Sequence, residues 1–178
     1  KVHIIDKDEV NAFAMPDNHL VVYTGLILKC KNEQALLGVL GHEIAHLQKN
    51  HVMKKLSKEI GFSVLMSMTG ANATMIKEVL HTLSSSAYDR NLEREADMES
   101  VNYMINANID PRPFADFMYE LSLNNEIHKY TYWISTHPES EDRAKYILNY
   151  LKGKKIKNTT ILSKESWLEF KQKIKDSN

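Results

Sequence analysis

The stretch Gly41-His42-Glu43-Ile44-Ala45-His46 organises the rest of this chain. It lies inside a helical pattern that runs from about residue 33 to residue 50. An α-helix turns about 100° per residue, so His42 and His46 project from the same face, one turn apart. Two imidazoles placed in this way can both bind one Zn²⁺. Glu43 lies beside the metal, where its carboxylate can take a proton from a zinc-bound water.

The residues around this motif make the helix apolar on nearly all sides, which is typical of a buried helix. These residues are Leu36, Leu37, Val39, Leu40, Ile44, Ala45 and Leu47. Histidines and a carboxylate on a buried helix need polar partners, and one metal ion can serve all three. The alternative, two histidines and a glutamate on a solvated face, is therefore disfavoured.

Length and composition are those of one globular domain. The chain has 178 residues, of which 43% are apolar and 26% are charged, and its formal net charge is zero. It therefore has no basic field for nucleic acid, and we expect no nucleic-acid partner. The single cysteine, Cys30, excludes an internal disulfide. No apolar run reaches the roughly 18–20 residues that span a bilayer.

Local patterns predict an α+β domain that is mostly helical with a small antiparallel sheet. Short β-branched or aromatic segments predict strands at Val2–Ile5, Val10–Ala14 and Leu20–Thr24. Helical patterns follow: a brief patch from residue 25, then 33–50 with Asn32 as N-cap, 51–72, 73–83, 92–107, 113–125, a helix ending near 151, and 167–174. For the apolar segment 60–76, a core helix, a mobile lid and a lipid-contacting surface all stay open.

We expect a single domain over residues 1–178, in which residues from about 152 to 178 form a peripheral C-terminal tail. The chain begins at Lys1 rather than at a methionine. This start is typical of a processed or excised segment, so a signal peptide or membrane anchor would lie outside it.

A catalytic zinc keeps three protein ligands and one open position, so a third ligand is required. The long zincin pattern needs glycine at position 49 and histidine at position 52. Those positions hold Lys49 and Val52, and His51 is out of phase, which excludes that class. Cys30 is disfavoured as a ligand, because its neighbours are not those of cysteine-ligated enzymes and a buried free cysteine is usually packing.

The better candidate for the third ligand is Glu93. Glu93 and Asp97 are four residues apart and share one face of a predicted helix. Glu93 can bind the metal, while Asp97 can accept the other N–H of a ligating histidine and fix its tautomer. The alternative is a charged surface face, which suits Glu95 and Glu99. For Glu93 both interpretations stay open at this point.

Five segments, in order, resemble one family of zinc peptidases. They are Asn11-Ala12-Phe13-Ala14-Met15-Pro16, Val22-Tyr23-Thr24-Gly25-Leu26, His42-Glu43-Ile44-Ala45-His46, Arg90 with Glu93 and Ala96-Asp97, and Thr136-His137-Pro138 with Arg143. The chain resembles the HtpX-like and CAAX-prenyl-protease-like metallopeptidases from about residue 10 to 150. It is most similar to their soluble periplasmic branch, typified by BepA. The membrane helices of HtpX-like proteins and the repeat domain of BepA are not in this sequence, so membrane topology and partner recruitment do not carry over.

The resemblance implies a zincin-like fold in which His42, His46 and Glu93 hold one zinc ion per chain and Glu43 is the general base. It also implies that Asn11, Ala12, Phe13 and Ala14 form an edge strand lining the active-site cleft. That strand would pair with an extended polypeptide substrate by β-augmentation.

Two further residues receive roles by resemblance. His137 would lie near the metal and either occupy the open zinc position as a gate or help to hold the developing oxyanion. Arg143 would stabilise the same oxyanion, alone or with His137. For each, the alternative is a residue without catalytic function, at a helix boundary or on the surface.

The implied activity is that of a zinc-dependent endopeptidase acting on extended or misfolded proteins. The resemblance suggests protein quality control in the bacterial periplasm or cell envelope, with membrane association only through regions outside this chain. Two alternatives stay open: a zinc-bound chaperone or scaffold that binds unfolded chains without cleaving them, and a protease that His137 inhibits. Glu43 weighs against the first, because a purely structural site needs no general base.

Overall fold

The computed structural model describes residues 1–61, 73–123 and 131–176, and the statements below refer to these residues. The strands are β1 (Val2–Ile5), β2 (Ala12–Met15) and β3 (His19–Tyr23). The helices are α1 (Thr24–Lys29), α2 (Glu33–Gln48), α3 (His51–Glu59), α5 (Ala73–Ser85), α6 (Arg90–Asn106), α7 (Arg112–Leu123), α8 (Thr131–Thr136), α9 (Ser140–Leu151) and α10 (Lys164–Asp176). The prediction of a mostly helical α+β domain with a small sheet is confirmed.

The sheet has the strand order β1-β3-β2, so β2 is an edge strand. Strands β2 and β3 pair antiparallel through a tight turn in which Asp17 and Asn18 have positive φ. The prediction of an all-antiparallel sheet is wrong for β1, which pairs parallel to β3. The chain reverses once between β1 and β2 and again between β2 and β3, so β1 and β3 point the same way.

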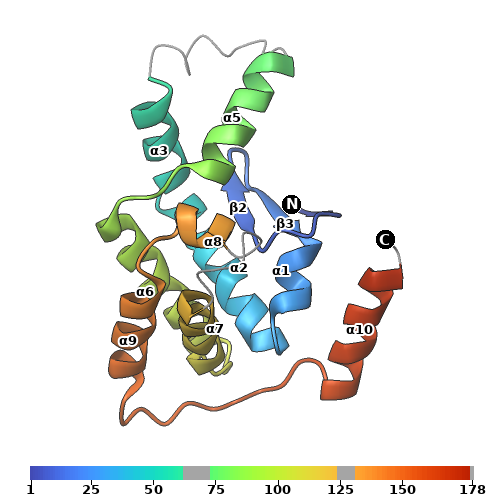
Figure 1. Ribbon diagram of the computed structural model, residues 1–178. Helices are drawn as coiled ribbons and strands as arrows, with labels where there is room; N and C mark the ends of the chain where they lie inside the picture. Colours follow the sequence, from blue (N-terminus) through green and yellow to red (C-terminus); the bar gives the residue numbers. More distant parts are fainter. Residues whose placement is uncertain (62–72, 124–130, 177–178) are drawn as a thin grey trace.

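Helix α2 crosses the middle of the molecule and carries the histidine motif (Figure 1). Its predicted N-cap is confirmed, because the Asn32 side chain accepts a hydrogen bond from the Ala35 N–H at 2.9 Å. Gly38 lets α7 pack closely, since a Cβ there would lie 2.3 Å from the Cβ of Phe114. Ser100 of α6 donates a hydrogen bond to the Gly38 carbonyl at 2.7 Å. Gly38 thus allows α7 to pack closely against α2, and Ser100 links α6 to α2.

The sheet separates two hydrophobic clusters, and alternate residues of β3 serve each. Leu20 and Val22 join the larger cluster with α2, α6, α7 and α9, whereas Val21 and Tyr23 join a smaller one with α3 and α5. Figure 1 shows α3 and α5 projecting together on one side of the sheet, with α6, α7 and α9 grouped on the other. The metal-ligand candidates lie where α2 passes between these groups.

Helix α10 follows a long connection after α9 and packs against α1, where Trp167 is buried (Figure 1). Helix α8 lies in an aromatic segment that carried no helix prediction. Of the predicted helix 51–72, residues 62–72 lie outside the described part of the chain, as does most of the apolar segment 60–76.

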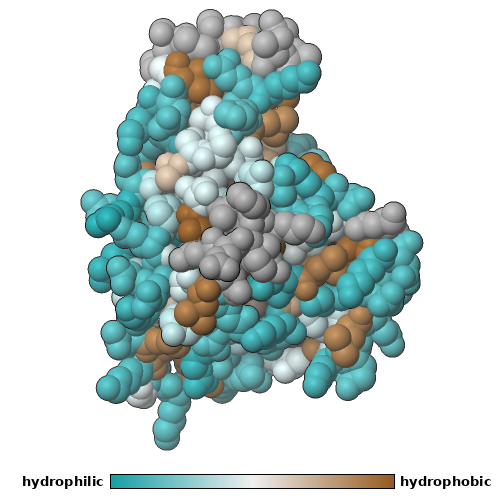
Figure 2. Space-filling model, viewed as in Figure 1, coloured by the Kyte–Doolittle hydropathy of each residue, from teal (hydrophilic) through white to brown (hydrophobic). Residues whose placement is uncertain are grey.

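Within the described ranges, no helix combines the length and apolar character needed to cross a bilayer. On the face shown in Figure 2, hydrophobic residues form small patches between hydrophilic ones.

Candidate metal centre

His42 and His46 project from one face of α2 and are both fully buried. Their Nε2 atoms lie 2.9 Å apart. Glu93 reaches them from the first turn of α6, with Oε1 3.3 Å from His46 Nε2 and Oε2 3.7 Å from His42 Nε2. Glu93 lies 47 positions after His46 in the sequence, yet α2 and α6 bring the ligand atoms of all three residues to one point.

The donor set fits a metal ion. His42, His46, Glu93 and His137 each offer one ligand atom, and these atoms all lie within 4.8 Å of one another. A tetrahedral zinc site with bonds of about 2.0–2.1 Å places its ligand atoms roughly 3.3 Å apart. The distances among the first three residues, from 2.9 to 3.7 Å, bracket that value. Nitrogen and carboxylate donors are also the ligands that catalytic zinc prefers.

Burial keeps the nitrogen of His46 available for a metal, and neighbouring positive charge keeps Glu93 ionised. Burial, and then the adjacent His42, lower the pKa of His46 to about 3. Burial alone would raise the pKa of Glu93, but Arg143 and the nearby histidines hold it well below its usual value. His46 is therefore neutral and Glu93 ionised near neutral pH, which are the forms that bind a metal.

Glu43 lies next to this cluster on α2 and is also fully buried. Its Oε2 accepts a hydrogen bond from the backbone N–H of Ala14 in β2 at 3.0 Å, and its Oε1 lies 3.1 Å from His137 Nε2. Burial would raise the pKa of Glu43, but the facing histidines, above all His137, lower it below the ordinary value. An ionised carboxylate beside the donor set can accept a proton.

Asp97 and Arg143 form a buried pair behind His42. Asp97 Oδ1 lies 2.8 Å from His42 Nδ1, on the side of the ring that faces away from the other ligands. Arg143 donates from Nε to Asp97 Oδ2 at 2.8 Å, and one terminal nitrogen donates to Oδ1 at 2.7 Å. Burial would raise the pKa of Asp97, but Arg143 and His42 lower it to about 2. Asp97 therefore remains an anion that can fix the tautomer of His42.

The guanidinium of Arg143 makes further contacts with the same cluster. Its Nη1 lies 2.6 Å from Glu93 Oε2 and donates to the His137 carbonyl at 3.1 Å. Arg143 thus contacts two carboxylates and a backbone oxygen, and the oxyanion role given to it from the sequence stays a prediction.

His137 lies between Glu43 and Glu93, directly after α8. Its Nδ1 is 2.9 Å from Glu93 Oε1 and 3.1 Å from His42 Nε2, and its ring stacks on Trp133 with centroids 4.8 Å apart. Burial would lower the pKa of His137, but the two glutamates raise it above the usual value. The ring therefore lies within contact distance of both the candidate base and a candidate ligand.

The four predicted substrate-binding residues, Asn11 to Ala14, are buried and lie at the β2 edge of the sheet. The Asn11 carbonyl accepts from the Tyr23 N–H at 3.1 Å, so the backbone of Asn11 faces β3. Backbone groups alternate along a strand, so those of Ala12 and Ala14 face away from β3, and the N–H of Ala14 is bound to Glu43. The edge of β2 that faces away from β3 pairs with no other strand among the described residues, and it borders the cluster.

The sequence patterns missed several residues that line the site. Tyr88 stacks on the ring of His46 with centroids 3.9 Å apart, and the ammonium of buried Lys55 lies 4.1 Å from the centroid of Tyr88. His51 is fully buried against His46 and contacts Glu95, a residue that the sequence assigns to a charged surface face. The signal for His51 was the preceding Asn50, a residue type that tolerates a left-handed backbone and can break a helix.

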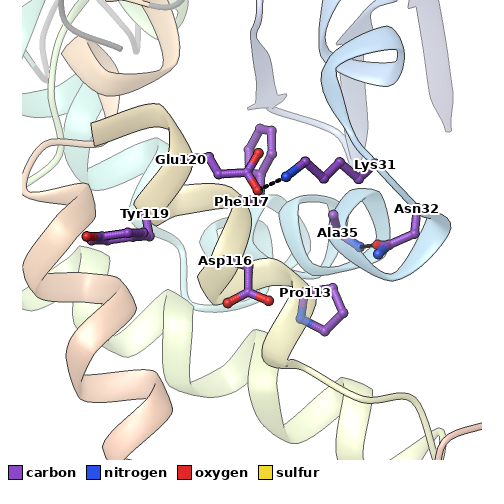
Figure 3. Close-up of a pocket in the computed structure, with 8 residues that line it drawn as sticks. All are labelled: Lys31, Asn32, Ala35, Pro113, Asp116, Phe117, Tyr119 and Glu120. Atoms are coloured by element: carbon purple, nitrogen blue, oxygen red, sulfur yellow. Dashed lines mark hydrogen bonds and ion pairs between the residues drawn. The ribbon is translucent and has the colours of Figure 1, made fainter. Parts of the chain in front are cut away.

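Another pocket lies away from this centre, between α7 and the residues that precede and begin α2 (Figure 3). It has a volume of about 240 Å³, and Lys31 forms an ion pair there with Glu120. None of the residues that line it belongs to the metal cluster: Lys31, Asn32, Ala35, Pro113, Asp116, Phe117, Tyr119 and Glu120.

The sequence is similar to those of several known proteins. The sequence model described as Peptidase family M48 matches residues 1–151. The metalloendopeptidase OMA1 of Bos taurus, named as mitochondrial, is 29% identical over 82% of this chain and 31% of its own length. The mitochondrial metalloendopeptidase OMA1 of Schizosaccharomyces pombe is 27% identical over 90% of this chain and 49% of its own length. The β-barrel assembly-enhancing protease of Yersinia pestis is 23% identical over 97% of this chain and 38% of its own length. The chain thus spans between about a third and a half of the length of these curated relatives.

Proposed function

Because the chain belongs to peptidase family M48, we propose that it is a zinc-dependent endopeptidase. The observation that carries this proposal is the grouping of His42, His46 and Glu93 around one point, with the buried carboxylate of Glu43 beside them. A site that only stabilised the fold would need no additional carboxylate without a ligand role. Three protein ligands also leave the open position that a catalytic zinc requires.

Each residue of the cluster receives one role in this proposal. His42, His46 and Glu93 bind zinc, and Asp97 fixes the tautomer of His42 through the 2.8 Å contact to Nδ1. Arg143 holds Asp97 and Glu93 in place, since its guanidinium contacts both carboxylates. Its contacts favour this holding role over direct contact with the substrate.

Zinc, when bound, supplies Lewis acidity, which makes water a better nucleophile and polarises the carbonyl of the scissile peptide bond. Glu43 takes the proton from the attacking water and later passes it to the leaving amine. The Ala14 N–H, which donates to Glu43 at 3.0 Å, orients the carboxylate for this transfer.

We propose that substrates bind as extended strands along the free edge of β2. The outward-facing backbone groups of Ala12 and Ala14 support this, because Ala14 itself contacts the base. A peptide hydrogen-bonded at this edge would run directly past Glu43. The strand is buried in the present arrangement, so substrate entry requires the site to open.

Extended or misfolded polypeptides are the substrate class that this binding mode favours, because a folded protein rarely offers an unpaired strand. We extend the proposal to protein quality control in the bacterial periplasm or cell envelope. Support comes from the Yersinia pestis relative, whose name refers to β-barrel assembly, whereas the two OMA1 relatives are named as mitochondrial. Fractionation of cells that express this protein tests the compartment.

A second candidate function is that of a protease whose own His137 inhibits it. His137 lies within 3.1 Å of His42 Nε2 and of Glu43 Oε1, so its ring competes for the space of a substrate carbonyl. If His137 gates the zinc, replacing it with alanine raises the rate of peptide cleavage while zinc remains bound. If His137 instead holds the oxyanion, the same replacement lowers the rate by about 10²–10³.

The experiment that tests the main proposal measures zinc content and casein cleavage for the wild type, Glu43→Gln and the control Glu99→Gln. We expect all three to bind one zinc per chain and only Glu43→Gln to lose cleavage. Zinc binding by all three with cleavage by none points to the chaperone or scaffold, or to inhibition by His137. Failure of the wild type to bind zinc contradicts the proposal.

A further inference from the structure

A buried histidine outside the metal-ligand set connects one of the predicted ligands to the protein surface. His51 is fully buried, and its Nδ1 lies 3.0 Å from the Nδ1 of His46. On the other side of its ring, His51 Nε2 lies 3.3 Å from Glu95 Oε2. The Glu95 side chain is 47% exposed, so this chain of three residues runs from the metal centre to solvent.

The backbone between α2 and α3 makes this contact possible. In an unbroken helix, His51 would be five residues after His46 and about 140° away around the axis, too far round to touch it. Instead α2 ends at Gln48, and Asn50 adopts the left-handed conformation with φ 57° and ψ 24°. This left-handed residue interrupts the helix and places the first residue of α3 against the ring of His46.

The positions of the protons follow from the metal-binding atom. His46 Nε2 is the atom that faces His42 and Glu93, so in the loaded site it is the ligand and carries no proton. The neutral ring must then carry its proton on Nδ1. That N–H faces His51 Nδ1, which has to accept it, and His51 therefore carries its own proton on Nε2. This N–H points at Glu95, an acceptor.

We propose that His51 is a positioning residue that holds His46 in the orientation and tautomer needed to bind zinc, through a hydrogen-bond chain that ends at Glu95. This inference rests on the proposed function, because it assigns His46 as a zinc ligand.

The two ligating histidines are then supported differently. His42 donates to Asp97, a carboxylate that is fully buried and paired with Arg143. His46 donates to a neutral imidazole whose own partner is at the surface. A neutral acceptor raises the basicity of its histidine less than a carboxylate does, so His46 is the more weakly supported ligand.

The first test reads the tautomers directly. Zinc-loaded protein labelled with ¹⁵N-histidine is studied by long-range ¹H–¹⁵N correlation spectra, in which signals of His51 are identified by their loss in His51→Asn. We expect the Nε2–H tautomer for His51 and the Nδ1–H tautomer for His46. A zinc-loaded wild type in which His51 carries its proton on Nδ1, or on both nitrogens, overturns the inference.

The second test asks whether His51 acts as a hydrogen-bond acceptor or only fills space. Zinc affinity is measured by competition with a chromophoric chelator for His51→Leu, which keeps volume without an acceptor, and His51→Asn, which can place its Oδ1 near the position of Nδ1. We expect His51→Leu to lower zinc affinity about 10–100-fold and His51→Asn to restore most of the loss. Equal affinities for the two variants overturn the inference, whatever their stability.

Glu95 has a closely matched control on the same helix. Both Glu95 and Glu99 lie 3.5 Å from Lys49 Nζ, but of these two glutamates only Glu95 contacts His51. We expect Glu95→Ala to lower zinc affinity more than Glu99→Ala. Equal effects of the two substitutions would show that Glu95 is not part of the hydrogen-bond chain. A wild type that binds no zinc overturns the proposed function and this inference together. A wild type that binds zinc with the wrong tautomer overturns the inference alone.

Discussion

Arg143 holds Asp97 through two parallel hydrogen bonds, from Nε to Oδ2 at 2.8 Å and from Nη2 to Oδ1 at 2.7 Å. Both side chains are almost completely buried, and the same guanidinium reaches Glu93. One cation thus compensates two buried carboxylates of the metal centre, one of them behind His42 and the other facing His46.

Replacing Arg143 with methionine should leave both carboxylates buried without their cation. We expect the free energy of unfolding of the metal-free protein to fall by about 3–5 kcal/mol, measured by urea denaturation. The control is Arg112→Met, which breaks an exposed ion pair with Asp110 and should cost less than about 1 kcal/mol. Equal losses of unfolding free energy in the two variants would contradict the stabilisation of Asp97 and Glu93 by Arg143.

Lys55 predicts a pH dependence of stability. Burial lowers its pKa from 10.5 to about 8, despite the nearby Glu43 and Glu93. Below pH 8 the folded protein keeps a buried charge that the unfolded chain holds in water, while above about pH 10.5 Lys55 is neutral in both states. The unfolded chain therefore binds more protons between these values, and the contribution of Lys55 to the free energy of unfolding rises with pH there.

The measurement compares Lys55→Met with the wild type in urea at several pH values. The free energy of unfolding of the variant relative to the wild type should fall by up to about 3 kcal/mol between pH 8 and pH 10.5. Lys54→Met, an exposed neighbour on the same helix, should show no such trend. A pH-independent difference for Lys55→Met would show that its ammonium titrates normally.

Gly38 predicts a packing defect in α2. An added Cβ would lie 2.3 Å from Phe114 Cβ and 2.4 Å from its Cγ, so α7 must shift. We expect Gly38→Ala to lower the free energy of unfolding by about 1–3 kcal/mol, measured by thermal or urea denaturation. The same substitution should cost less in a Phe114→Leu background, where the neighbouring side chain is smaller. Additive losses would mean that the two residues do not compete for space.

The proposed binding of substrate along β2 predicts an alternating sensitivity to N-methylation. In a bound peptide substrate, every second backbone N–H would face the edge formed by Ala12 and Ala14, because the backbone groups of a strand alternate in direction. N-methylation at these positions should raise KM, whereas methylation at the positions between them should be tolerated. Uniform tolerance along the peptide, measured by steady-state cleavage, would rule out strand pairing.

Much of the local structure could be predicted because neighbouring residues encode it. The spacing of apolar residues predicted α2, and Asn32 at its start provides the cap that the structure contains. The four-residue spacing of His42 and His46 placed both on one face by helix geometry alone. Glu93 and Asp97 share a helix face for the same reason, although the sequence could not say what that face touches.

Other features depend on how distant segments pack. The parallel pairing of β1 with β3 could not be predicted, since strand patterns reveal alternation but not the direction of a partner. His51 was rejected as a ligand by its phase. Asn50 signals that the helix can break there, but not that the break places His51 against His46. Arg143 reaches Asp97 from 46 residues away, a contact that no local period contains.

The sequence by itself determined that this chain forms a buried helix with two histidines and a carboxylate ready for one metal ion, because periodicity and side-chain chemistry are local properties. Only the tertiary structure decided which side chains support that site. Buried donors and charges must find partners, and the partner of each, Asp97 for His42 or His51 for His46, depends on which helices the fold brings together.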